Sequence, residues 1–301
     1  MLCFVSLPVA EAVIVYGTNG AGSNNTSAPG DDPGWANVGT VGGATAVYLG
    51  SQTTGFWMLT ANHVDLSSGT VALNGGNYTI LGSATQIGTA DLKVFRLLSD
   101  PSLPGVTIAN TAPTSGTSVT MIGNGRGRGA QTTWDGNPAG WGSPGPDAEG
   151  YAYGTSQIVR WGTNAVQANS LSFVSSTTTF STIFNNTSNA NEAQASLGDS
   201  GGAVFSKSTG VWELTGTMIA VGVWTGSGNN YGANFIGQPS DTVVHSVLSL
   251  PNGGSATFSV QLSTYRSAIL AAIPEPSTYG LLVIGGLFAA WRIRRRTADQ
   301  R

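Results

Sequence analysis

Short apolar runs alternate with clusters of Gly, Asn, Pro and Ser over most of the chain, between residues 35 and 265. The turn-forming clusters recur about every ten residues, and polar and apolar positions partly alternate within the runs, as in antiparallel sandwiches and barrels. We therefore expect an all-β chain, with strands at Ala44–Leu49, Phe56–Thr60, Tyr78–Leu81, Leu92–Leu97, Ser118–Ile122, Ile158–Trp161 and Gly216–Val223.

One segment near the C-terminus has helical periodicity instead. Its apolar residues fall on one helical face and Pro274 stops it, which predicts a helix over Leu262–Ile273. The segment Gly123–Gly150 is dense in Gly, Pro and Trp, and this composition predicts a long loop.

Charge is scarce along the whole chain. Only 27 of 301 residues are charged, whereas soluble domains average about 25%. Lys93 and Lys207 are the only lysines, so the chain lacks the basic stripe of a nucleic-acid-binding protein. Hydrophobic residues make up 40% of the chain, enough to bury a core, which excludes a disordered protein.

The C-terminal segment differs from the rest in hydropathy and in charge. The run Tyr279–Trp291 contains no charged residue, and five of the ten arginines lie in the last ten residues. Such a basic cluster would stay on the cytoplasmic side of a bilayer, although the run could also be a buried C-terminal helix. The order of Pro274-Glu275-Pro276, apolar run and Arg cluster resembles the PEP-CTERM sorting signal of certain Gram-negative bacteria.

This resemblance implies export and a transient inner-membrane anchor within residues 274–301. It also implies processing near the motif by an exosortase-type enzyme, so the protein would reach the cell surface or the medium. Removal of everything after Pro276 would change the formal net charge from −3 to −7.

The N-terminus has some features of a signal peptide. Leu2–Ala10 is apolar, and Ala10-Glu11-Ala12 has the small-x-small form of a signal-peptidase site, but a basic n-region is missing. The segment is either a truncated signal peptide over residues 1–12, which we expect, or the first strand of the domain. Cys3, the only cysteine, lies within it, so the mature chain would contain no disulfide.

Gly198-Asp199-Ser200-Gly201-Gly202 is the segment with the strongest chemical signal. A nucleophilic serine needs an exposed hydroxyl and nearby backbone N–H donors for a developing oxyanion. Flanking glycines allow the tight backbone that aims such donors inward. The segment alone is also compatible with a plain glycine-rich loop.

Two further residues supply the remaining parts of a catalytic triad. His63 ends Thr60-Ala61-Asn62-His63, just past an apolar run, and Asp91 directly precedes the strand-like segment Leu92–Leu97. Each alone would be an ordinary surface histidine or turn aspartate. In the order His, Asp, Ser, they resemble the trypsin/chymotrypsin family of serine proteases, because other serine-hydrolase folds place the trio differently.

The resemblance covers most of residues 40–273. It implies two Greek-key antiparallel β-barrels with a short C-terminal helix, at residues 13–112 and 113–273, followed by a hydrophobic anchor helix within residues 274–301.

The resemblance also assigns roles to single residues. Ser200 is the nucleophile, His63 the general base, and Asp91 the group that orients His63. The backbone N–H groups of Gly198 and Ser200 form the oxyanion hole. Asp65 and Asp100 are alternative acids, but Asp65 is close to His63 in sequence and Asp100 precedes a proline at a turn. His245 lies in an insertion over about 225–252, and we interpret it as a loop residue.

Several positions depart from the family pattern. Val64 follows the histidine, where family members often have cysteine. Gln194, six residues before Ser200, would floor the primary specificity pocket, yet it is neither an acidic nor a small residue. Segment Thr217–Val221 lacks the usual Ser-Trp-Gly wall, so substrate preference stays open.

Asp199 suggests an activation step. In the family, the aspartate of this motif can pair with a freshly cut N-terminus beginning Ile-Val or Val-Val. Cleavage after Ala12 would expose Val13-Ile14-Val15. We therefore hypothesise an ion pair between Asp199 and the Val13 α-amino group, which full activity of an N-terminally extended chain would disprove.

The sequence as a whole predicts an exported serine endopeptidase that cuts protein or peptide substrates through an acyl-enzyme. The alternatives are a catalytically weak surface or matrix protein on a protease fold, and an esterase. Two histidines, one cysteine and scattered acids give no metal-ligand spacing, so we expect no metal or other cofactor.

Overall fold

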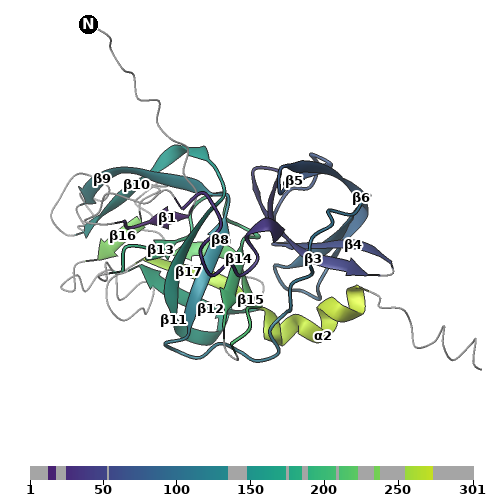
Figure 1. Cartoon of the computed structure of the whole chain (residues 1–301). Coiled ribbons are helices and arrows are strands. Elements are labelled where there is room, and N and C mark those ends of the chain that lie inside the picture. Colours follow the sequence, from purple (N-terminus) through teal and green to yellow (C-terminus); the bar gives the residue numbers. More distant parts are fainter. Residues whose placement is uncertain are drawn as a thin grey trace, which may run out of the picture.

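Two closed β-barrels of six antiparallel strands each make up most of the structure (Figure 1). The computed structural model describes residues 13–17, 25–52, 54–134, 148–173, 176–184, 189–207, 210–222, 234–237 and 255–273. The barrels lie side by side, and the chain completes the first before it enters the second. This arrangement confirms the predicted all-β fold with two Greek-key barrels.

The first barrel has the strand order β2-β3-β4-β7-β6-β5 and closes where Thr40 of β2 pairs with Ala72 of β5. Buried and exposed positions alternate along β5, so that Val71 and Leu73 face the interior. Its strands are β2 (Val38–Val41), β3 (Ala44–Gln52), β4 (Gly55–Thr60), β5 (Thr70–Leu73), β6 (Gly76–Gln86) and β7 (Lys93–Leu97). A short 3-10 helix, η2 (Trp35–Asn37), leads into it.

The second barrel has the strand order β11-β12-β17-β15-β14-β8 and closes between β8 and β11. Its interior is filled by apolar side chains from successive strands, among them Met121, Val166, Phe180, Val204 and Met218. Its strands are β8 (Ser118–Gly123), β11 (Arg160–Phe173), β12 (Thr177–Phe184), β14 (Ala203–Ser206), β15 (Glu213–Gly222) and β17 (Ser255–Gln261).

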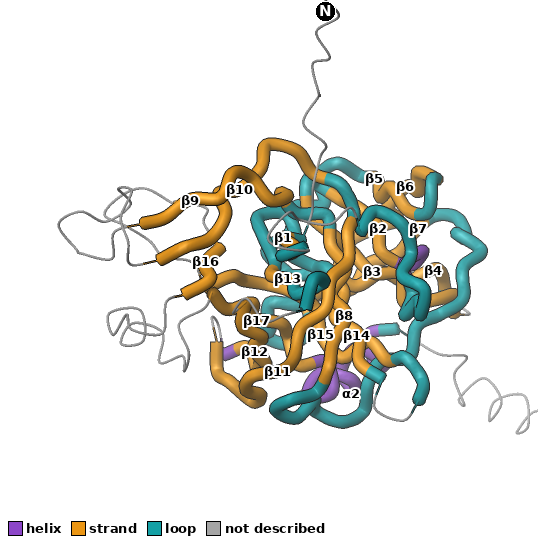
Figure 2. The backbone as a smooth tube through the Cα atoms, turned by 60° about the vertical axis from the view of Figure 1, so that its left-hand side comes forward, coloured by secondary structure: helices purple, strands orange, loops and turns teal. Residues whose placement is uncertain are grey.

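A separate three-stranded sheet projects from the second barrel (Figure 2). It consists of β9 (Arg126–Trp134), β10 (Ala148–Gln157) and β16 (Asn234–Gly237). The prediction of one long loop over Gly123–Gly150 is therefore wrong at both ends. Glycine and polar residues interrupt the alternation of apolar residues in this segment, so the local sequence does not indicate strands. The strands form because β9 and β10 pair with each other in antiparallel orientation.

The helix α2 (Leu262–Ala272) confirms the helix predicted before Pro274. It continues directly from β17 of the second barrel and lies under the first barrel (Figure 1). Ile269 and Ile273 belong to one buried apolar cluster with residues of both barrels. In addition, Arg266 Nε donates to the carbonyl of Ile108 at 3.2 Å, which ties the helix to the segment that connects the barrels.

Several predicted segments lie outside the described residues: the signal peptide over residues 1–12, the sorting and anchor segment over residues 274–301, and His245. Within the described ranges, no helix combines the length and apolar character needed to cross a membrane.

Candidate active site

The pairing of β4 with β7 brings His63 next to Asp91. Thr60, the last residue of β4, pairs with Lys93, the first residue of β7. His63 lies on the turn that follows β4, which is closed by a bond from Val64 N–H to the Ala61 carbonyl at 3.2 Å. Asp91 lies two residues before Lys93, so the two turns meet at the same end of the first barrel.

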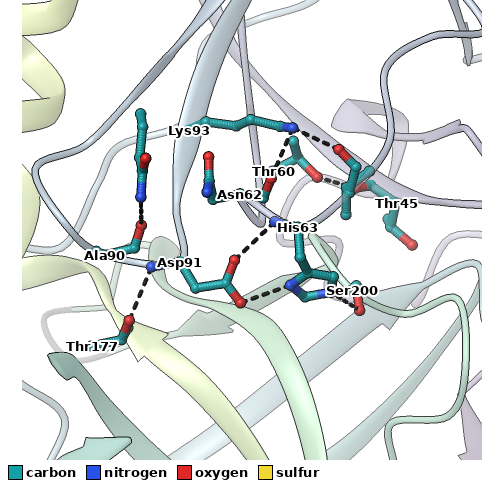
Figure 3. A network of polar contacts seen from close by, with 11 residues as sticks. Thr45, Thr60, Asn62, His63, Ala90, Asp91, Lys93, Thr177 and Ser200 are labelled. Carbon is teal, nitrogen blue, oxygen red and sulfur yellow. Dashed lines mark hydrogen bonds and ion pairs between the residues drawn. The ribbon is translucent and has the colours of Figure 1, made fainter. Parts of the chain in front are cut away.

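The Asp91 carboxylate binds both the ring and the backbone of His63. Its Oδ2 lies 2.7 Å from His63 Nδ1, and its Oδ1 accepts the His63 backbone N–H at 3.0 Å (Figure 3). Burial raises the pKa of Asp91, but hydrogen bonds from His63 and Asn62 and the charge of His63 outweigh it, so the pKa lies below its ordinary value. Asp91 is therefore an ionised acceptor at neutral pH.

Ser200 approaches the other side of the same imidazole from the second barrel. Its Oγ lies 2.8 Å from His63 Nε2. Ser200 precedes β14, and its carbonyl accepts the Thr45 N–H of the first barrel at 2.9 Å. The predicted His63, Asp91 and Ser200 thus form one continuous chain of hydrogen bonds across the junction of the barrels (Figure 3).

The turn before Ser200 has the backbone that the flanking glycines predict. Gly198 has φ of +99°, a conformation that favours glycine. Its carbonyl accepts the Thr45 hydroxyl at 3.0 Å, and Thr45 Oγ1 in turn accepts the Asn124 N–H at 2.9 Å. Among the described residues, the N–H groups of Gly198 and Ser200 donate to no backbone carbonyl, and their assignment to an oxyanion hole stays a prediction.

Asp199 points away from this turn into the protein and is fully buried. Its carboxylate accepts the N–H groups of Ser196 and Gly125, each at 2.7 Å, and also the backbone N–H of Val13. Burial raises the pKa of Asp199 to about 6, because these hydrogen bonds only partly offset the desolvation. The two-residue strand β1 (Ile14–Val15) pairs with β13 (Ala193–Gln194) beside it.

Gln194 lies on β13 and is fully buried. Among the described residues, neither its Oε1 nor its Nε2 has a hydrogen-bond partner. Its assignment to a specificity pocket stays a prediction. Ile219 and Ala220 of β15 line a groove of about 390 Å³ together with His63 and Asp91.

The two alternative acids are engaged elsewhere. Asp65 accepts the backbone N–H and the hydroxyl of Ser67 at 2.9 and 2.6 Å, which lower its pKa. Asp100 accepts the Ser102 N–H at 2.8 Å. The structure thus pairs His63 with Asp91 and with neither alternative.

Four further hydrogen bonds at this site involve three residues to which the sequence analysis gives no role: Thr177, Thr60 and Lys93. The Thr177 hydroxyl accepts the Asp91 N–H at 2.9 Å, and the Thr60 hydroxyl donates to the Thr45 carbonyl at 2.7 Å (Figure 3). Lys93 binds the carbonyls on both sides of His63. Only Lys93 has a sequence signal, since it follows Asp91 by two residues and is one of two lysines.

Comparison with known proteins gives the fold and a sorting motif. The chain is similar to neuropsin, a serine protease expressed in the limbic system of mouse brain, with a TM-score of 0.50 and 14% identity, over 80% of this chain and 96% of that one. At this identity the likeness shows the fold alone, a serine-protease fold. Residues 272–296 match the PEP-CTERM protein-sorting motif, which indicates export.

A second solved structure is the HtrA-type protease AlgW with a decapeptide, at a TM-score of 0.43 and 19% identity. The match covers 75% of this chain and 51% of AlgW, so the chain spans about half the length of that protease. No curated protein sequence matches the chain.

Proposed function

We propose that this protein is an exported serine endopeptidase. The observation that carries the proposal is the position of His63 between Asp91 Oδ2 at 2.7 Å and Ser200 Oγ at 2.8 Å. A serine hydroxyl is activated for acyl transfer when it is hydrogen-bonded to a histidine base that is oriented in turn by a carboxylate. The serine-protease fold and the sorting motif support the same function.

In the proposed reaction, Ser200 Oγ attacks the scissile carbonyl while His63 Nε2 takes its proton. Asp91 keeps the Nδ1–H of His63 oriented and stabilises the imidazolium that forms. The N–H groups of Gly198 and Ser200 bind the oxyanion of the tetrahedral intermediate. His63 then protonates the leaving amine, and a water molecule releases the acyl group from Ser200 by the same steps.

An extended peptide fits the strand beside the catalytic residues. The pairing of β15 with β14 ends at Thr217, whereas its pairing with β17 continues to Gly222. On the β14 side, no described strand pairs with the segment from Ile219 onward, and this segment lines the groove with His63. A substrate can add here as a further antiparallel strand, which gives backbone recognition without fixing the side chain at the cleavage site.

The proposal includes the path to the outside of the cell. The PEP-CTERM motif over residues 272–296 would anchor the chain transiently in the inner membrane until an exosortase-type enzyme processes it. Mass spectrometry of the secreted protein should then find a C-terminus near Pro276. A secreted chain that retains Arg292–Arg301 would disprove this processing step.

The activity is tested with a fluorophosphonate probe and a peptide library. The protein should react with the probe at Ser200 and cleave internal peptide bonds, whereas Ser200→Ala should lose turnover by at least about 10⁴-fold with unchanged thermal unfolding. Ser206→Ala, in the adjacent strand, is a control. Absence of labelling would favour a non-catalytic surface or matrix protein, and cleavage of small esters alone would favour an esterase.

A further inference from the structure

Lys93 occupies an unusual place behind the proposed general base. Its Nζ donates to the carbonyl of Asn62 at 3.0 Å and to the carbonyl of Val64 at 2.6 Å, the residues that flank His63 (Figure 3). The other lysine of the chain, Lys207, pairs with Asp31 at 2.9 Å on the surface. Lys93 is thus directed at the backbone of a single turn.

The Asn62–His63 peptide unit is held at both of its ends. Its carbonyl accepts the Lys93 ammonium, and its N–H donates to Asp91 Oδ1 at 3.0 Å. A peptide unit between a cation at its oxygen and an anion at its N–H is polarised, so that each hydrogen bond strengthens the other. The same two groups therefore fix both the position and the orientation of the backbone that carries His63.

Both charged groups come from the same short stretch of chain. Lys93 is the first residue of β7, and Asp91 lies two residues before it on the turn that leads into this strand. Because Lys93 pairs with Thr60 across the barrel sheet, its side chain starts at the base of the His63 turn. Any displacement of the turn relative to Asp91 would have to break the contacts with Lys93.

The surroundings of Lys93 disfavour its charged form. Desolvation lowers the pKa of Lys93, and the nearby charges of Asp65 and Asp91 offset this only in part. A half-buried ammonium contributes little to stability by itself. No disulfide can secure the turn either, because Cys3 is the only cysteine in the chain.

We propose that Lys93 is a positioning residue for catalysis, whose ammonium fixes the His63 turn so that the imidazole stays aligned between Asp91 and Ser200. This inference rests on the proposed endopeptidase function. Lys93 itself touches no reacting atom and acts through the backbone of His63.

The kinetic test compares Lys93→Met with the matched control Lys207→Met. Loss of the ammonium should lower kcat by about 10- to 100-fold with KM nearly unchanged, because a small misalignment affects the reacting groups more than substrate binding. Lys207→Met should keep wild-type kcat and KM. If Lys93→Met retains the wild-type kcat, the proposal is wrong.

A second measurement does not need turnover. The proton between His63 Nδ1 and Asp91 Oδ2 should give a far-downfield proton NMR signal in the wild-type protein at acidic pH. The signal should be lost or broadened in Lys93→Met and retained in Lys207→Met, while both variants unfold cooperatively. If it persists unchanged in Lys93→Met, Lys93 does not position His63.

The two readouts separate the two proposals. If the wild-type protein neither cleaves peptides nor reacts with fluorophosphonate, the endopeptidase function fails, yet the NMR comparison still decides the role of Lys93. If Lys93→Met does not fold, Lys93→Gln replaces it. This variant keeps one donor without the charge, and it should show a weakened signal and a smaller loss of kcat. Wild-type values for both in Lys93→Gln would refute the positioning role.

Discussion

The carboxylate of Asp91 has two functions at His63, because it binds the ring and the backbone with different oxygens. Asp91→Asn keeps the shape of the side chain but replaces an ionised acceptor with a neutral amide, which favours the wrong imidazole tautomer. We expect kcat to fall by about 10⁴-fold while the fold is retained. Asp100→Asn is the control, because its carboxylate contacts Ser102 and Tyr48 rather than His63 or Lys93, and it should stay near wild-type activity when peptide cleavage is assayed.

Gly201, next to Ser200, lies in a position where the backbone and its neighbours exclude a side chain. Gly201 has φ of +85°, and a Cβ there would collide with the Thr45 carbonyl and the Thr60 hydroxyl. Gly201→Ala should therefore lower the free energy of unfolding by about 3 kcal/mol or more, from strain and overpacking together.

Gly75 provides the matched control for this change. It has φ of +78° in the β5–β6 turn, with open space where a Cβ would lie. Gly75→Ala should lower the free energy of unfolding by only about 1 kcal/mol. Equal losses in the two variants, measured by urea denaturation, would show that the contacts around Gly201 do not matter.

At the residue scale, the candidate catalytic residues can be predicted from local sequence, whereas the residues that hold them in place cannot. His63, Asp91 and Ser200 belong to short motifs, so local sequence marks them. Thr177 lies 86 residues from Asp91 and reaches it only because the two barrels pack together. A threonine in a chain rich in polar β residues has no local feature that predicts such a contact.

Elements with strong apolar alternation are predicted well, and long polar strands are not. β3, β4 and β7 have buried apolar positions and appear at the predicted places. β11 runs from Arg160 to Phe173, far beyond the predicted Ile158–Trp161, because eight of its 14 residues are Gly, Asn, Ser, Gln, Thr or Arg. Its order comes from pairing with β8 and β12, which depends on partners distant in sequence.

The helix α2 contributes to stability through the face it presents to the barrels. Ile269 is fully buried in the cluster shared by both barrels, so Ile269→Ala should reduce the free energy of unfolding by about 2–5 kcal/mol. Ser267→Ala on the exposed face should change it by less than about 0.5 kcal/mol. Denaturant unfolding of both variants measures the difference, and a small loss for Ile269→Ala would mean that the helix packs only loosely.

At the scale of the whole molecule, the site depends on both barrels and on the first described residues of the chain. His63 and Asp91 come from one barrel and Ser200 from the other. Behind Ser200, the N–H of Val13 reaches the buried Asp199. Removal of residues 1–12 would place an α-amino charge at this point, which links the processing of the N-terminus to the electrostatics of the site.

Asp199→Asn should therefore change the free energy of unfolding in opposite directions in two forms of the protein: the extended chain, which keeps residues 1–12, and the processed chain, which begins at Val13. In the extended chain the pKa of Asp199 is raised to about 6, so the folded state binds the proton more tightly than the unfolded state. The contribution of Asp199 to stability should then be fully present below about pH 4 and fall by roughly 3 kcal/mol as the pH rises through 6, and Asp199→Asn should abolish this part of the pH dependence. Urea unfolding across pH 4–7 measures it.

In the processed chain the Val13 ammonium would be the partner of the ionised Asp199. Asp199→Asn would then leave a buried cation unpaired, and we expect a loss of about 3–5 kcal/mol at pH 7 together with loss of peptide cleavage. The same substitution should be neutral or stabilising at pH 7 in the extended chain, since it removes a buried charge without a counterion. Equal effects of Asp199→Asn in both chains, or full activity of the extended chain, would disprove activation by N-terminal processing.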